Sequence, residues 1–152
     1  MDKENEPGEM EILKITIGIE ARTKKNSMRL VKLGGRIVPI PSKQYKDFEE
    51  SCAWYLQPFT NMEIDYPVNV RCLFYMKTRR RVDLTNLLEA ADDVLVKYRV
   101  LADDNMTIVA GHDGSRVLYD KSNPRIEIEI TKMETNDGYI NREIRGRHVY
   151  SD

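Results

Sequence analysis

Hydrophobic and polar residues alternate along three stretches of the chain, at residues 13–19, 68–76 and 126–130. Alternation with a period of two is typical of a strand that buries one of its faces. The residues on the expected buried faces are Leu13, Ile15, Ile17 and Ile19; Val68, Val70, Cys72, Phe74 and Met76; and Ile126, Ile128 and Ile130. We therefore expect these strands to supply the sheet side of a hydrophobic core.

Two further stretches carry apolar residues at helical spacing. The first helix is expected to open at Pro41-Ser42, with Ser42 as its N-cap, and to end before Pro58. Its apolar residues are Tyr45, Phe48, Cys52, Tyr55 and Leu56. The second helix is expected to begin at Asp83, and its apolar face consists of Leu84, Leu87, Leu88, Ala91, Val94, Leu95 and Tyr98. Each helix therefore has one face to place against the sheet.

Glycine and proline residues mark the connecting segments. The loop after the first strand contains a glycine pair and two prolines, which predicts an irregular hairpin formed by Arg29–Val31 and Arg36–Ile40. Later, Met106–Gly111 and Arg116–Tyr119 flank His112-Asp113-Gly114. An Asp-Gly pair between two short apolar runs predicts a second hairpin there.

The order of strand, helix, strand, helix and further strands predicts a two-layer α+β domain. We expect a mixed or largely antiparallel sheet with the two main helices on one face. The domain is expected to span residues 12–133 of the 152-residue chain, with a flexible leader at residues 1–11 and a polar tail at residues 134–152.

Composition narrows the function classes. The chain is 41% hydrophobic and 32% charged, and it contains neither a run of apolar residues long enough to cross a membrane nor a secretory signal. Its two cysteines, Cys52 and Cys72, are too few for a disulfide framework, so we expect reduced thiols in a cytoplasmic protein. The sequence also lacks a glycine-rich phosphate loop and a Ser/His/Asp set, and His112 is expected to be a turn or surface residue.

The net charge is only −1, but the charges are unevenly distributed. Residues 21–46 contain eight basic residues and no acidic one, and a second basic run is Lys77-Thr78-Arg79-Arg80-Arg81. Residues 83–104 hold six acidic residues, which are Asp83, Glu89, Asp92, Asp93, Asp103 and Asp104. Positive segments around a negative centre can bind phosphate only if a cation lies among the carboxylates.

Helical spacing places Glu89 and Asp93 on the same side of the second helix as Asp83, while Asp103 and Asp104 follow on a turn. Several carboxylates without histidine or cysteine are the ligands that Mg²⁺ or Mn²⁺ prefers. The alternative is a solvated acidic helix face. For the basic segments the corresponding alternatives are a phosphate-binding surface and an ordinary charged surface.

The stretch Arg79–Leu87, followed by Asp103-Asp104-Asn105, resembles the RusA family of Holliday junction resolvases. The family signature is a basic run, then Asp-Leu-Asp-Asn-Leu at a helix start, then an Asp-Asp pair near twenty residues later. Lys24-Lys25-Asn26-Ser27 and Pro41-Ser42-Lys43-Gln44-Tyr45 also resemble the N-terminal loop and first helix of that family. The resemblance covers residues 12–133. It implies an Mg²⁺-dependent homodimeric endonuclease that makes paired nicks in four-way DNA junctions during recombination and repair.

By the same resemblance, Asp83 and Asp104 match acidic metal-binding positions. Two positions depart from the family pattern, because Thr85 stands where the second Asp is expected and Glu89 where a catalytic lysine is expected. We therefore predict a rearranged metal site. Its ligands are Asp83, Glu89, Asp93 and Asp104; its catalytic residues are Asp83, Asp104 and, for the missing lysine, Lys77; its DNA-binding residues are Lys24, Lys25, Asn26, Arg79, Arg80 and Arg81.

Two other hypotheses remain open on the sequence. A noncatalytic DNA-binding protein on the same fold would bind junctions without regard to Mg²⁺ and would cut no strand. A protein-interaction module, whose acidic helix contacts a partner, would have no affinity for DNA.

Overall fold

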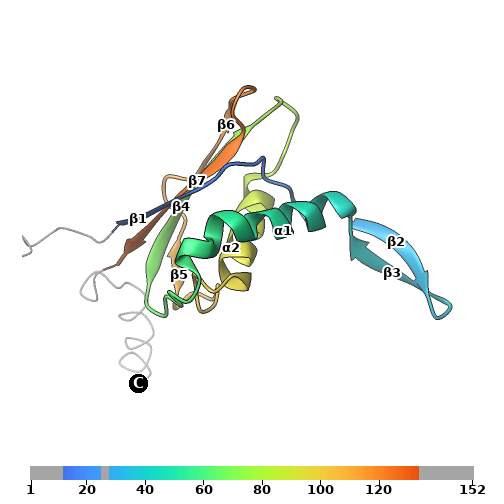
Figure 1. Ribbon diagram of the computed structural model, residues 1–152, viewed down its shortest axis with the longest axis horizontal. Coiled ribbons are helices and arrows are strands. Elements are labelled where there is room, and N and C mark those ends of the chain that lie inside the picture. Colours follow the sequence, from blue (N-terminus) through green and yellow to red (C-terminus); the bar gives the residue numbers. More distant parts are fainter. Residues whose placement is uncertain (1–11, 25–27, 134–152) are drawn as a thin grey trace, which may run out of the picture.

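The computed structural model describes residues 12–24 and 28–133 (Figure 1). The expected leader and tail lie outside these residues. The elements in chain order are β1 (Ile12–Ile17), β2 (Met28–Leu33), β3 (Arg36–Pro41), α1 (Lys43–Leu56), the 3₁₀ helix η2 (Gln57–Phe59), β4 (Val68–Met76), α2 (Leu84–Lys97), β5 (Val109–Gly111), β6 (Arg116–Tyr119) and β7 (Arg125–Lys132). Neither α-helix in this part of the chain is long and apolar enough to cross a bilayer.

The main sheet is mixed, which confirms the expected α+β class. Strand β7 lies between β1 and β4 and is antiparallel to both, whereas β5 and β6 run parallel to β4. The register aligns inward-facing residues across the three long strands, so that Ile15 and Cys72 both lie opposite Ile128. Helices α1 and α2 lie on the same side of this sheet (Figure 1). The polar face of the sheet is turned away from them.

The core lies between the sheet and the two helices. The strands contribute Ile15, Ile17, Val68, Val70, Cys72, Phe74, Ile126, Ile128 and Ile130, and the helices contribute Tyr45, Phe48, Cys52, Leu56, Leu87, Ala90, Ala91, Val94 and Leu95, all of them buried. The expected N-cap of α1 is confirmed, since the Ser42 side chain accepts a hydrogen bond from the backbone N–H of Tyr45 at 3.2 Å. Both cysteines are buried free thiols.

The second hairpin predicted from the sequence is wrong. Strands β5 and β6 do not pair with each other, and each pairs with β4 in parallel. The segment between them fills the gap along β4, because the Asn69 side chain bonds the backbone of Asp113 in both directions and the Ser115 hydroxyl accepts from the backbone N–H of Cys72 at 3.0 Å. These bonds satisfy backbone groups of the interrupted edge. The segment with the Asp-Gly turn thus connects two short strands that pair with the same edge of β4, and it does not form a hairpin.

Gly114 makes this connection sterically feasible, and its replacement by alanine is expected to destabilise the fold. Its φ is +84°, and an added Cβ would lie 2.9 Å from Cδ and Nε of Arg71. The left-handed conformation alone costs an L-residue about 1–2 kcal/mol. Urea unfolding should show a larger loss for Gly114→Ala than for Gly35→Ala, whose φ of +78° is similar but whose Cβ would meet open space. Equal losses would mean that the contact with Arg71 costs nothing.

Strands β2 and β3 form a separate antiparallel pair, here called the ribbon (residues 28–41). A hairpin was expected around the glycine pair, and the structure confirms it with two regular six-residue strands. Gly34 and Gly35 both have positive φ, as a two-residue turn between antiparallel strands requires. The ribbon extends beyond the N-terminal end of α1, away from the main sheet (Figure 1).

Candidate functional site

Helix α2 carries most of the acidic residues that the sequence singled out. Asp83 is its N-cap and is exposed, and its carboxylate accepts a hydrogen bond from the side chain of Asn86 at 3.3 Å. Asp93 lies ten residues further along the helix, which corresponds to a rise of about 15 Å. The predicted ligands therefore lie at two levels of α2, with Asp83 at the first turn and Asp93 almost three turns later.

Negative charge is concentrated around Asp93, at the second of these two levels. Burial raises the pKa of Asp93, the charges of Glu89 and Asp104 raise it further, and the ammonium group of Lys24 opposes them. Burial also raises the pKa of Asp104, together with a hydrogen bond to Asp103 and its charge. The charges of two predicted ligands, Glu89 and Asp104, thus act on a third, Asp93, and we call these three residues the acidic site.

The donors of the acidic site suit a hard divalent cation. Carboxylate oxygens are what Mg²⁺ prefers, and a cation would offset the charges of Glu89 and Asp104 that, after burial, raise the pKa of Asp93. Within residues 12–24 and 28–133, no three His, Cys, Asp or Glu side chains form a group that could hold a metal ion by themselves.

Lys24 reaches the acidic site from the linker between β1 and β2. Ala21 and Thr23 are buried and hold this linker against the body of the domain. The side chain of Lys24 is exposed, and its charge acts on Asp93. Lys25 and Asn26, which were also expected to bind DNA, lie outside the described residues.

Most of the second basic run lines a polar cavity of about 440 Å³ at the end of β4, here called the basic pocket. Its lining is Glu20, Ala21, Arg22, Thr23, Gln44, Met76, Lys77, Thr78, Arg80, Arg81 and Val82. The Glu20 carboxylate organises it by accepting the backbone N–H of Lys77 and by pairing with Arg22 at 3.5 Å. Arg79 is different, because its guanidinium lies 4.3 Å from the centre of the Tyr119 ring. Three of the predicted basic residues, Lys77, Arg80 and Arg81, therefore face one pocket.

The family model described as endodeoxyribonuclease RusA matches residues 20–131. The chain belongs to the RusA family. A search among curated proteins gives no significant match. The matched segment of this RusA protein includes the basic pocket, all of α2 and the Asp103-Asp104 pair. Membership confirms the family expected from the sequence and indicates a nuclease with Holliday junction resolvase activity on branched DNA.

Two side chains of the RusA domain that the sequence reasoning missed form a partly buried pair beside the acidic site. Asp92 on α2 is only 8% exposed, and Nε2 of His112 lies 2.8 Å and 3.1 Å from its two carboxylate oxygens. The hydrogen bond to Asp92 raises the pKa of His112, although burial opposes the rise. The expectation of a turn or surface role for His112 was therefore incomplete. The spacing of α2 could have indicated Asp92, which lies at the border of its apolar face.

The carboxylates of the acidic site are expected to cost the RusA domain stability. Glu89 and Asp93 are like charges at i and i+4, a pair that destabilises a helix by about 0.2–0.5 kcal/mol. Asp93→Asn should raise the free energy of unfolding in urea by about that amount at neutral pH. Because the pKa of Asp93 is higher in the folded than in the unfolded state, the penalty is absent below the unfolded value and complete above the folded value, so the gain should vanish in acid. A gain that persisted in acid would contradict the charge explanation.

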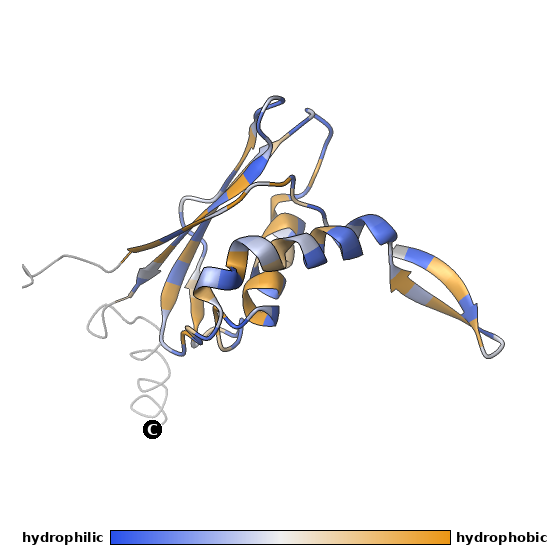
Figure 2. Cartoon of the chain, viewed as in Figure 1, coloured by the Kyte–Doolittle hydropathy of each residue, from blue (hydrophilic) through white to orange (hydrophobic). Residues whose placement is uncertain are grey.

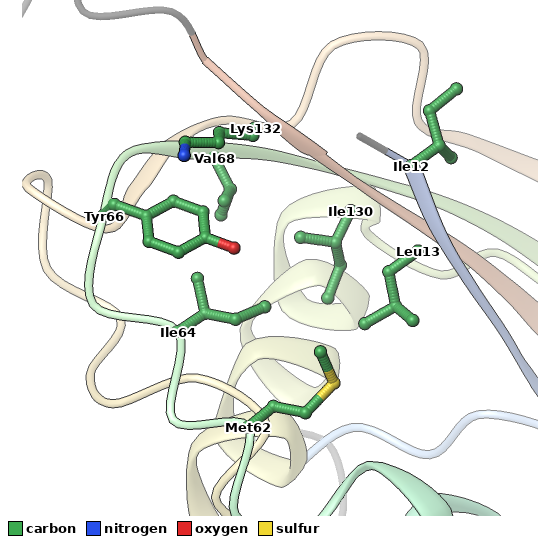
Figure 3. Close-up of a pocket in the computed structure, with 8 residues that line it drawn as sticks. All are labelled: Ile12, Leu13, Met62, Ile64, Tyr66, Val68, Ile130 and Lys132. Carbon is green, nitrogen blue, oxygen red and sulfur yellow. The ribbon is translucent and has the colours of Figure 1, made fainter. Parts of the chain in front are cut away.

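A second cavity of the RusA domain, of about 210 Å³, lies at the opposite end of the sheet (Figure 3). Its lining is Ile12, Leu13, Met62, Ile64, Tyr66, Val68, Ile130 and Lys132. None of the predicted site residues is among them, and the one cation, Lys132, lies over the ring of Tyr66. This apolar cavity has no groups for phosphate binding or hydrolysis, so the candidate site is the acidic site with the basic pocket.

Proposed function

We propose that this RusA protein hydrolyses phosphodiester bonds of four-way DNA junctions with Mg²⁺, or Mn²⁺ in its place, as a homodimer that makes paired nicks. Its place would be DNA recombination and repair in the cytoplasm. The observation that supports the proposal is the proximity of Glu89 and Asp104 to Asp93, with Lys24 beside them, in a chain that the RusA family model matches, because gathered carboxylates beside basic groups favour a bound cation.

The acidic site would hold one ion, and Asp83, about 15 Å away along α2, would contribute only to a second one. A bound divalent ion supplies a nucleophilic water and neutralises charge that develops on the phosphate. The protein's own residues have separate tasks. Among the described residues, Lys24 is the cation whose charge acts on Asp93, whereas Lys77 belongs to the basic pocket. We therefore assign the role of the missing family lysine to Lys24 in preference to Lys77.

The basic pocket would hold the sugar–phosphate backbone of a junction arm. Arg80 and Arg81 supply charge there, and Glu20 keeps Arg22 and the end of β4 in place. Such contacts position DNA without reading its sequence. Recognition of a branched junction then depends on shape, and two sites related by a two-fold axis can meet the two strands that are cut.

The departures at Thr85 and Glu89 favour a second candidate, a protein that binds junctions without cutting them. One experiment separates the two. The purified full chain is incubated with a synthetic four-way junction and with a linear duplex of the same sequence, in Mg²⁺ or in a chelator. The proposal expects nicks in the junction only, and only with Mg²⁺. Junction binding that ignores Mg²⁺, with every strand intact, would establish the noncatalytic candidate.

Arg80→Ala and Arg81→Ala are each expected to weaken junction binding and to reduce its dependence on salt. Each lost phosphate contact should lower the slope of log affinity against log salt by about 1. Fluorescence anisotropy over a series of salt concentrations measures this slope. The control is Lys14→Ala, since Lys14 lies on the far face of the sheet, paired with Glu129 at 3.9 Å. A control slope reduced as much as the others would remove the basic pocket from DNA binding.

A further inference from the structure

The ribbon exposes apolar side chains in a way that the core does not require. Leu30 is 73% exposed, Ile37 64% and Leu33 59%, and Figure 2 shows hydrophobic residues along both of its strands. No residue of the ribbon belongs to the hydrophobic core or packs against it. Leu30 and Ile37 lie on one face and Leu33 on the other, as the cross-strand register shows. Both faces of the ribbon are therefore without an apolar partner in the described part of the chain.

A two-stranded pair of this kind is at best marginally stable alone in water. Exposed apolar clusters of this type mark sites of interaction. Pro39 and Pro41 lie in β3, and proline is tolerated in a strand where its nitrogen faces the free edge. That edge of the ribbon then lacks backbone donors for extending another sheet. At the β3 edge, recognition therefore depends on side chains, whereas β2 holds no proline.

The charges of the ribbon indicate what kind of surface it fits. Residues 28–41 contain Arg29, Lys32 and Arg36 and no acidic residue. DNA would pair with these three cations but would leave the apolar side chains in water. A surface that combines apolar groups with carboxylates can bind both the cations and the apolar side chains of the ribbon. A protein partner is therefore favoured over DNA.

The chain carries such a surface on α1. An open groove of about 320 Å³ is lined by Ile19, Glu20, Arg22, Gln44, Asp47, Phe48 and Ser51, and we call it the α1 groove. Ile19 and Phe48 give it apolar character, and Asp47 supplies a carboxylate. Glu20, Arg22 and Gln44 also line the adjoining basic pocket, and there Glu20 pairs with Arg22. Along the same face of α1 follow Glu50 and Trp54, and the Trp54 side chain is 77% exposed. An exposed indole can bury apolar groups and also attract an arginine or lysine cation.

We infer that the ribbon of one protomer docks in the α1 groove of a second copy of this chain, and that the exchange is mutual. Within one chain the ribbon points beyond the N-terminal end of α1, and no residue of the ribbon lines the groove (Figure 1). A two-fold axis would bring each ribbon to the partner's groove and close the assembly. The inference rests on the homodimer of the proposed function. It adds to that proposal the surfaces that would join the two nuclease sites.

Light scattering on the full chain tests the association. The wild type should be a dimer, and the double variant Leu30→Asp/Ile37→Asp should be a monomer at the same concentration. Because the ribbon lies outside the core, the thermal unfolding of the body should remain cooperative in this variant. A matched control replaces Thr16, which is exposed on the far face of β1, by aspartate and should stay dimeric.

Cross-linking tests the geometry. Ile37→Cys protein is mixed with Gln44→Cys protein under mild oxidation, and mass spectrometry identifies disulfides between the two variants. The native Cys52 and Cys72 are buried and do not compete. The exchange predicts an Ile37→Cys to Gln44→Cys disulfide and none with Thr16→Cys. The inference would be overturned if the wild type were a monomer, if the ribbon substitutions left the dimer intact, or if this disulfide did not form. Ribbon variants that changed only the affinity for DNA would also overturn it.

These outcomes are separable from those of the proposed function. An exchanged, cross-linked dimer that cuts no junction would refute the nuclease proposal and leave the ribbon assignment standing. Junction cleavage by a protein whose ribbon variants remain dimeric would do the reverse.

Discussion

Asp104→Asn is expected to lower junction cleavage by more than about 100-fold, since even outer-shell partners of a metal ion are typically worth 10–100-fold. Asp104 lies on the turn after α2, and its charge acts on Asp93. Burial raises the pKa of Asp104. Asparagine keeps the size of the side chain but removes a charged donor from the acidic site. Junction binding should persist, because the basic pocket is untouched. Single-turnover cleavage of a labelled junction in Mg²⁺ measures the effect.

Asp103→Asn is the matched control for this prediction. Its carboxylate accepts hydrogen bonds from the backbone N–H of Asp104 at 2.7 Å and from the Asn105 side chain at 3.0 Å. The single side-chain oxygen of asparagine can still accept from the backbone N–H of Asp104, and only the bond from Asn105 is lost, so cleavage should fall far less than in Asp104→Asn. A second readout, the melting temperature, does not depend on activity. Mg²⁺ should raise the melting temperature of the wild type and of Asp103→Asn, and it should raise that of Asp104→Asn much less. Equal stabilisation of all three would exclude Asp104 as a ligand.

The sequence predicted the long elements because their periodicity reports burial directly. In β4 and β7 the apolar residues at alternate positions became the buried face, and Ser42 capped α1 as expected. The second hairpin failed for a physical reason. An Asp-Gly turn is a local signal, but the pairing of short strands is decided by which neighbour offers free backbone groups. Here β4 offered its whole open edge to β5 and β6, and this competition is invisible in the local sequence.

The candidate site shows the same limit. The positions of Glu89 and Asp93 on one side of α2 followed from helical spacing, whereas the approach of Asp104 and Lys24 depends on how two loops return to the helix. Spacing could not rank Lys24 above Lys77, because both are basic residues near the expected site. The metal site stays a prediction, because no three His, Cys, Asp or Glu side chains within residues 12–24 and 28–133 lie together as a metal-binding group.

His112→Ala is expected to destabilise the fold by roughly 1–3 kcal/mol, the usual cost of leaving a buried polar group without its partner. The Asp92 side chain is 11% exposed and that of His112 27%, so water replaces the lost contact only in part. The pair also joins α2 to the segment between β5 and β6, and its loss should loosen that edge of the sheet. Urea unfolding at pH 6 measures the change in the free energy of unfolding.

The pH dependence of this loss identifies its cause. The hydrogen bond to Asp92 raises the pKa of His112 above its ordinary value of 6.5, so the folded state holds this proton more tightly than the unfolded state. The stabilisation is therefore complete below pH 6.5 and declines as the pH rises through the folded value. The difference between wild type and His112→Ala should be larger at pH 6 than at pH 9. Adding Asp92→Asn to His112→Ala removes the buried charge and should recover part of the loss. A loss that was the same at both pH values and unchanged in the double variant would mean that His112 acts by packing alone.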